Sequence, residues 1–236
     1  MNDRIAKEKL NIFLLIDAST SMRGKRIAQV NAAIKDIRKY LLDLQKENAA
    51  VDFYLTLIPF ATEASFYDGA KECAISSFRY DGIRCGGFSN LDQAYELLEG
   101  LLHKERNGGI MPDFGGAAPI MLLLTDGHPT GKAHLTSLKK LEKLPWFQAA
   151  LRYGVAIELD DARTIKVLSS FVGSNGDVVY CYDSSLLKRI IKVIVVTASK
   201  VKSQTANVGS SPCKAPLQTL QQVIAEELSD TEDWEW

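Results

Sequence analysis

The chain has no clear excess of charge of either sign. Its 236 residues include 28 Lys and Arg against 29 Asp and Glu, a net charge of −1. Nucleic acids and anionic lipid surfaces attract basic proteins, so we expect neither as a partner. Long apolar runs are also missing, and stretches such as 119–124 are far too short to span a bilayer. The opening MNDRIAKEKL has no apolar core of a secretory signal, which favours a cytoplasmic location.

Cysteine and histidine are scarce. There are four cysteines and three histidines, with no CxxC motif and no histidine at a zinc-like spacing from a cysteine. We therefore expect reduced thiols rather than a zinc site or a disulfide framework. A bridge between Cys73 and Cys85 stays open, because a hairpin between them would bring the two together.

Apolar segments are plentiful, and they alternate between continuous runs and helical periodicity. This order is typical of βαβ units. It predicts an α/β fold, a doubly wound, Rossmann-like sheet of six strands, mostly parallel with one antiparallel edge hairpin. The expected strands are 11–17, 51–60, 119–125, 151–157 and 178–182, with a hairpin over 63–78 that turns at Asp68-Gly69. The expected helices are 25–45, 91–102, 135–144 (stopped by Pro145), 162–171 and 184–201.

The composition changes after residue 201. Residues 202–216 are polar and contain Gly, Ser and Pro, as in a flexible linker. Residues 217–236 predict an amphipathic helix followed by an acidic tail, with six carboxylate side chains and no Lys or Arg. Trp234 and Trp236 in this tail are candidate contacts for a basic partner; packing of the helix on its own domain is the alternative.

Oxygen-bearing side chains follow two of the most apolar predicted strands. Asp17 ends the first, with Ser19 and Ser21 at alternate positions after it, and Asp126 ends the strand 119–125. Between them in the chain, a Gly-Gly turn carries Ser89. Ligands collect where the carboxyl ends of parallel strands meet, and carboxylates with hydroxyls suit a hard cation such as Mg²⁺ or Mn²⁺. We therefore predict a metal site made of these five residues.

The pattern Asp17-x-Ser19-x-Ser21, a Gly-Gly turn with a hydroxyl residue, and Thr125-Asp126-Gly127 resembles the metal-ion-dependent adhesion site of von Willebrand factor A (VWA) domains. The resemblance covers residues 9–201 and implies a module that binds a protein partner through the cation. In the family the third hydroxyl is usually threonine, whereas Ser89 stands here and lacks the β-branch that restricts the rotamer.

The segment 125–130, TDGHPT, resembles the bacterial TerY-like group within this family. That likeness implies an intracellular protein of a tellurite-resistance or stress module, with a protein kinase and a PP2C-type phosphatase as partners.

Two other functions compete with the metal-dependent module. A metal-free VWA scaffold is favoured by Ser89. An aspartate-based phosphotransfer enzyme would use Asp17 as acceptor, but it needs a carboxylate two residues later, where Ser19 stands. His128 is the only tempting base, and we expect it to be an exposed turn residue. We predict that the chain is not an enzyme.

Overall fold

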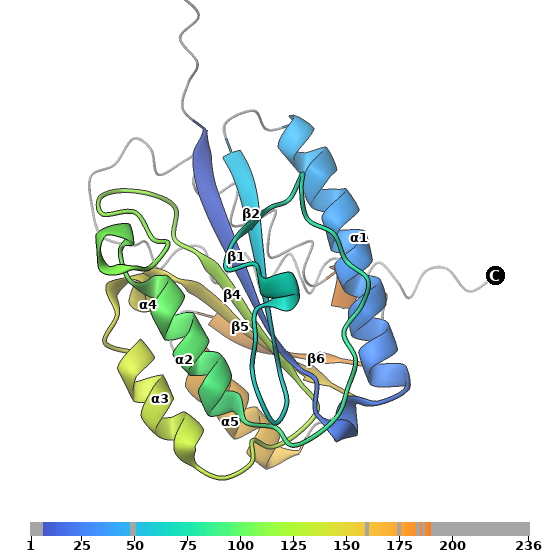
Figure 1. Cartoon of the computed structure of the whole chain (residues 1–236). Coiled ribbons are helices and arrows are strands. Elements are labelled where there is room, and N and C mark those ends of the chain that lie inside the picture. Colours follow the sequence, from blue (N-terminus) through green and yellow to red (C-terminus); the bar gives the residue numbers. More distant parts are fainter. Residues whose placement is uncertain are drawn as a thin grey trace, which may run out of the picture.

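The computed structural model describes residues 7–47, 51–158, 161–173, 176–182, 185 and 187–189. In this part of the chain, six strands form one sheet in the order β3-β2-β1-β4-β5-β6 (Figure 1). All neighbours pair in parallel except β2 and β3, which are antiparallel. The strands are β1 (Glu8–Asp17), β2 (Val51–Phe60), β3 (Cys73–Ala74), β4 (Ile120–Thr125), β5 (Leu151–Ile157) and β6 (Gly176–Cys181). The predicted doubly wound α/β fold with an antiparallel edge is confirmed.

The central strands are buried on both faces because helices cover both sides of the sheet. In β1, Leu14 and Ile16 belong to the core cluster beneath α1, whereas Phe13 and Leu15 belong to the cluster beneath α2, α3 and α5. Figure 1 shows α1 on one side of the sheet and α2, α3 and α5 on the other. The unbroken apolar run of β1 follows from this, since neither side of the strand faces water.

The helices begin and end close to the predicted positions. They are α1 (Lys25–Glu47), α2 (Leu91–Leu102), α3 (Ala133–Leu141), α4 (Pro145–Ala149) and α5 (Ala162–Val172), with short 3-10 turns η1 (Thr20–Met22), η2 (Tyr67–Gly69) and η3 (Glu105–Asn107). Pro145 starts α4 rather than directly ending α3, because proline suits the first turn of a helix. Asp161 caps α5 by accepting a hydrogen bond from the Arg163 amide.

The antiparallel edge differs in detail from the predicted hairpin over 63–78. The turn at Asp68-Gly69 is present as η2, but β3 pairs with Leu55 and Tyr54 of β2 rather than within that segment. Beyond β3, Ile75 and Phe78 are buried in the core cluster beneath α1. Burial against the domain stabilises this edge, whereas an isolated hairpin is marginal in water. Cys73 and Cys85 are free thiols, so the bridge left open above does not form.

Several predictions fall on residues outside the described part of the chain. Of the predicted helix 184–201, residues 185 and 187–189 are helical and Leu187 is buried in the core. The predicted linker 202–216 and the helix and tail 217–236, with Trp234 and Trp236, lie outside the described residues. No helix in the described ranges is long and apolar enough to cross a membrane.

Candidate functional site

The site lies where the strand order reverses, at the carboxyl ends of β1 and β4. These strands are neighbours, with Ile16 paired to Leu124, so Asp17 and Asp126 leave the sheet at the same edge. Both residues are buried, with 1% and 2% of their surface exposed. Two carboxylates are thus held together beneath the loops at the position expected of a ligand site in an open α/β sheet.

The Asp17 carboxylate collects hydrogen bonds from three separate segments. It accepts from the Ser19 amide at 2.9 Å, the Ser89 hydroxyl at 3.0 Å and the Thr125 hydroxyl at 2.7 Å. Burial raises the pKa of Asp17, because desolvation disfavours the charged form, although these donors act in the opposite direction. In the described residues no cationic side chain forms an ion pair with this carboxylate, so a bound cation would complete its charge balance.

The second half of the site is a chain of hydroxyls that ends on Asp126. The hydroxyls of Ser19 and Ser21 lie 3.0 Å apart, and that of Ser21 donates to Asp126 Oδ1 at 2.8 Å. The other oxygen of Asp126 accepts a hydrogen bond from Arg26 Nη1 at 2.5 Å. All five predicted metal ligands are therefore joined by hydrogen bonds into one polar cluster, in which Ser21 is the exposed member and the other four are buried.

Backbone hydrogen bonds hold the three loops against one another. Thr20 donates its amide and its hydroxyl to the Gly87 carbonyl at 3.1 and 3.0 Å. The Thr130 amide donates a hydrogen bond to the Ser89 carbonyl at 2.7 Å, and the Thr130 hydroxyl accepts one from the Ser89 amide at 3.2 Å. Gly87 has φ +82°, and a Cβ atom there would lie 2.1 Å from Thr62 Oγ1. The second glycine of the Gly-Gly turn thus has a steric cause, because only glycine permits this close approach.

Sequence reasoning missed two contributors to the cluster. Thr125 was part of the Thr-Asp-Gly motif, but its bond to Asp17 was not expected. Arg26 had a weak signal: the first turn of α1 contains no acidic residue and begins with Lys25 and Arg26. Basic residues are unfavourable at that end of the helix dipole, so a compensating carboxylate was to be expected nearby.

The donor set fits a hard divalent cation such as Mg²⁺ or Mn²⁺ better than zinc or copper, which prefer nitrogen and sulfur ligands. The described residues contain no cluster of three or more His, Cys, Asp or Glu side chains that could hold a metal. Two carboxylates and three hydroxyls would hold an ion only together with water, which is the habit of Mg²⁺. Asp17, Ser19, Ser21, Ser89 and Asp126 are the side chains that would hold it.

The surface beside the cluster has an exposed aromatic residue and a hollow. Phe88, next to Ser89, is 66% exposed. A hollow of about 270 Å³ borders Ala18 and the end of β2, and Glu63 and Arg84 line it with opposite charges.

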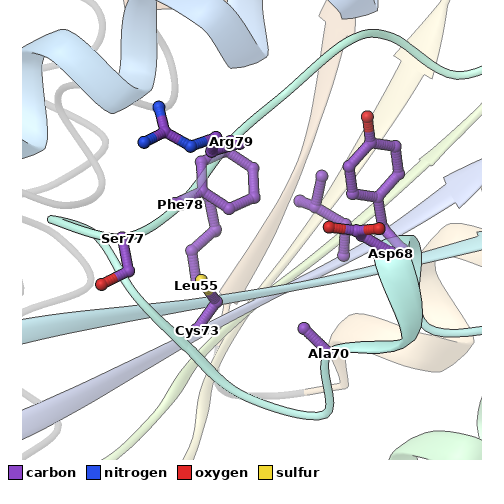
Figure 2. A pocket seen from close by; sticks show the side chains of 9 residues that line it. Leu55, Asp68, Ala70, Cys73, Ser77, Phe78 and Arg79 are labelled. Carbon is purple, nitrogen blue, oxygen red and sulfur yellow. The ribbon is translucent and has the colours of Figure 1, made fainter.

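Two other features do not contribute to the site. His128 is exposed, as predicted, but its Nε2 lies 3.2 Å from Asp161 and its Nδ1 lies 3.2 Å from Thr164, so it is engaged at the start of α5. A separate hollow lies at the β2–β3 edge, where Cys73, Phe78 and other side chains from β2 and the following loop surround it (Figure 2). Its lining has one acidic residue, Asp68, and does not provide a second set of converging carboxylates.

Comparison of the sequence with known proteins finds a matching family model and several related proteins. The family model for the von Willebrand factor type A domain matches residues 11–193. Inter-alpha-trypsin inhibitor heavy chain H1 from Sus scrofa is 29% identical over 133 residues, 53% of this chain and 14% of that protein. The human heavy chain H1 is 33% identical over 128 residues, 51% of this chain and 13% of that protein. The chain thus matches only about one seventh of the length of these relatives.

Two solved structures share the fold. A von Willebrand factor type A protein from Catenulispora acidiphila superposes with a TM-score of 0.60 at 14% identity, covering 81% of this chain and 43% of that chain. Proximal thread matrix protein 1 from the mussel byssus superposes with a TM-score of 0.54 at 15% identity, covering 82% of this chain and 48% of that chain. At this level of identity the likeness concerns the arrangement of the sheet and helices alone.

Proposed function

The chain belongs to the von Willebrand factor type A domain family, and on that premise we propose that it binds a protein partner through one divalent cation. The ion is Mg²⁺ or Mn²⁺, at the carboxyl edge of the sheet, held by Asp17, Ser19, Ser21, Ser89 and Asp126. The observation that carries the proposal is the buried carboxylate of Asp17, which accepts hydrogen bonds from hydroxyls of two other segments and forms no ion pair with a cationic side chain of the described residues.

The partner completes the site from outside. Two carboxylates and three hydroxyls leave a hard cation dependent on water, and a carboxylate of a partner is a stronger ligand than a water molecule. The exposed ring of Phe88 supplies an apolar contact beside that position. The TerY-like turn at 125–130 supports a protein kinase and a PP2C-type phosphatase of a stress or tellurite-resistance module as partners, in the cytoplasm.

We propose an interaction module rather than an enzyme. A phosphotransfer reaction at Asp17 would need a general acid or base two residues later, and Ser19 stands there with its hydroxyl bonded to Ser21. His128, the histidine beside the Thr125-Asp126-Gly127 motif, is engaged with Asp161 and Thr164. Among the described residues, these contacts leave neither Ser19 nor His128 free to act as a general acid or base at Asp17.

A metal-free scaffold is the second candidate, and one contact favours it. Arg26 places a positive charge on Asp126 at 2.5 Å, so a cation from the chain itself already neutralises half of the acidic pair. Ion titration separates the two candidates.

The test is calorimetric titration of the chelator-treated full chain with Mg²⁺ and Mn²⁺. The wild type is expected to release or absorb heat and to gain thermal stability at millimolar ion. Asp17→Asn, which preserves the shape of the side chain but removes its charge and one of its two accepting oxygens, is expected to show neither. Asp81→Asn, at an exposed position, is the matched control and behaves as wild type. Absence of any ion-dependent signal in the wild type rejects ion binding by the native chain and leaves the scaffold.

Partner binding is tested with a purified protein kinase and a purified PP2C-type phosphatase of a tellurite-resistance module. The wild type is expected to bind its partner in Mg²⁺. Binding should be lost in chelator and in Asp17→Asn. In Phe88→Ala it should weaken about tenfold, as is typical of an interface anchor. Ion affinity of Phe88→Ala is expected to stay at the wild-type value. Equal binding in Mg²⁺ and in chelator would reject recognition through the ion.

The carboxy-terminal residues form a separate proposal. We propose that residues 9–201 are the VWA domain, that 202–216 link it to a helix and acidic tail at 217–236, and that Trp234 and Trp236 contact a basic partner surface. The support is the change of composition after residue 201 and the six acidic side chains of the tail. Deletion of residues 203–236 is expected to weaken partner binding without changing ion affinity; unchanged binding would reject the role of the tail.

A further inference from the structure

Arg26 lies in the first turn of α1 and directs its guanidinium into the candidate metal site. Its Nη1 lies 2.5 Å from Oδ2 of Asp126, whose side chain is completely buried, and the same nitrogen donates to the Ser21 carbonyl at 3.2 Å. Asp126 and Ser21 are two of the five proposed ligands. The Arg26 guanidinium therefore lies where a bound ion would lie close by, and it already compensates the negative charge of Asp126 that the ion would need.

A second carboxylate lies within reach of the same guanidinium. Arg26 Nε is 3.5 Å from Glu158 Oε2, and Glu158 directly follows β5, the strand beside β4. Lys25 and Gln29 also donate to Glu158 Oε1, each at 3.0 Å. Arg26 thus lies between two carboxylates at neighbouring strand ends, one inside the proposed metal site and one outside it.

The backbone at Glu158 is unusual for a residue with a side chain. Its φ is +51°, one of two positive values among the described non-glycine residues, and its amide donates to the Cys181 carbonyl at 2.8 Å. This conformation costs free energy in a residue with a Cβ atom, and such strain is commonly found where a side chain must be presented in a particular direction. Here the strained residue presents its carboxylate to the first turn of α1.

We infer that Arg26 is a built-in competitor of the divalent ion for Asp126, and that Glu158 accepts the guanidinium when the ion binds. The inference rests on the proposed metal site. A guanidinium and a divalent ion on one carboxylate repel each other, and burial of Asp126 strengthens that repulsion relative to water. Glu158 lowers the cost of displacing Arg26 because it offers a carboxylate at the neighbouring strand end. The balance between the two carboxylates sets the ion affinity of the site.

The test is calorimetric titration of Mn²⁺ into the full chain and three single variants. Arg26→Gln is expected to bind about tenfold more tightly than wild type, because the competing charge is gone. Glu158→Gln is expected to bind several-fold more weakly, because Arg26 then has Asp126 as its remaining carboxylate. Lys25→Gln is the matched control: it removes the same charge from the adjacent residue, which contacts Glu158 but forms no ion pair with Asp126 in the described structure, and affinity should stay within about twofold.

A double variant and a charge-conserving variant separate competition from simple changes of charge or structure. In the Arg26→Gln background, Glu158→Gln should lose most of its effect, since there is no guanidinium left to accept. Arg26→Lys keeps the positive charge and should not raise the affinity. If Arg26→Lys tightens binding as much as Arg26→Gln, or if the effect of Glu158→Gln is the same in both backgrounds, the competition is rejected.

The outcomes also separate this inference from the proposed metal site. Wild-type binding that Arg26→Gln leaves unchanged rejects the competition and leaves the metal site standing. Binding by Arg26→Gln alone supports the competition and means that Arg26 keeps the wild-type site closed to the ion. Binding by neither chain rejects both. A residue that merely ties α1 to the sheet would lower the unfolding free energy when changed, without raising ion affinity.

Discussion

The hydroxyl of Thr125 donates a 2.7 Å hydrogen bond to the carboxylate of Asp17. Asp17 ends β1 and Thr125 ends β4, so this bond joins the two central strands at the edge where they leave the sheet. Thr125 also accepts the Gly127 amide at 3.2 Å, which orients the turn that carries Asp126. One hydroxyl therefore fixes both carboxylates of the candidate site.

Thr125→Val is expected to lower the free energy of unfolding by about 1–3 kcal/mol in chelator, because a buried carboxylate loses a donor. Urea denaturation measures the change. Thr56→Val is the matched control: its buried hydroxyl donates to the Lys71 carbonyl at 2.9 Å, a neutral acceptor, so its loss should cost only about 1 kcal/mol. If Thr125→Val costs no more than Thr56→Val, the bond to Asp17 has no special weight.

The two glycines of the Gly86-Gly87 turn should respond differently to alanine. Gly87→Ala brings a Cβ atom into Thr62 at a positive φ, so the loop must move and Ser89 with it. We expect a loss of roughly 2 kcal/mol in unfolding free energy, within the range for a strained backbone position, and weaker Mn²⁺ binding. At Gly86 the added atom meets Arg23 Nη2 at an ordinary 3.6 Å, so Gly86→Ala should bind Mn²⁺ nearly as wild type. Similar losses at both positions would refute the steric argument.

Ser89 allows a test of the hydroxyl itself. Ser89→Ala removes an oxygen that donates to Asp17 at 3.0 Å, and Mn²⁺ affinity should fall about tenfold, equivalent to about 1.4 kcal/mol. Ser89→Thr keeps the oxygen and adds a β-branch that restricts the rotamer, so affinity should equal or exceed that of the wild type. The Thr130 amide donates to the Ser89 carbonyl, a main-chain contact that neither substitution removes. If Ser89→Thr binds Mn²⁺ as weakly as Ser89→Ala, the hydroxyl at this position does not ligate the ion.

Cys85 reports on the charge of the site. Burial raises the pKa of its half-buried thiol from 9.0 to about 11, and the carboxylates of Asp17 and Asp126 add to the rise. At pH 8 its alkylation by iodoacetamide should therefore be roughly tenfold slower than that of free cysteine, after allowing for the greater nucleophilicity of a more basic thiolate. The rate should still increase above pH 9, where an ordinary thiol levels off. Site-resolved mass spectrometry measures it.

The same shift has a defined sign for stability and for ion binding. Because the folded pKa lies above that of an unfolded cysteine, the contribution of this thiol to stability is present below about pH 9 and is lost as the pH rises towards 11. A divalent ion that neutralises Asp17 and Asp126 should lower the pKa of Cys85 and speed its alkylation at pH 8. An unchanged rate in saturating Mg²⁺ would contradict an ion at those carboxylates.

Much of the fold and the position of the site could be predicted from local patterns. The continuous apolar runs ending at Asp17 and Thr125 specify strands covered on both faces, and helical periodicity specifies the elements that cover them. Parallel strands then bring their carboxyl ends to one edge, which assembles Ser19, Ser21 and Asp126 without further information. The hairpin over 63–78 was wrong in its pairing, because the turn chemistry at Asp68-Gly69 does not determine which strand the segment joins.

The sequence by itself therefore determined the sheet, its helices and the five oxygen-bearing side chains that meet at its edge. Strands and helices that are buried on one or both faces have characteristic spacings of apolar residues, and these spacings can be read from neighbouring positions. Tertiary structure alone decided that Arg26 reaches Asp126, a hundred positions away, and that Glu158 stands beside it. Lysine and arginine at a helix start look alike in sequence wherever they point. Which carboxylate such a charge meets depends on how the helix lies across the sheet, and only long-range packing specifies that.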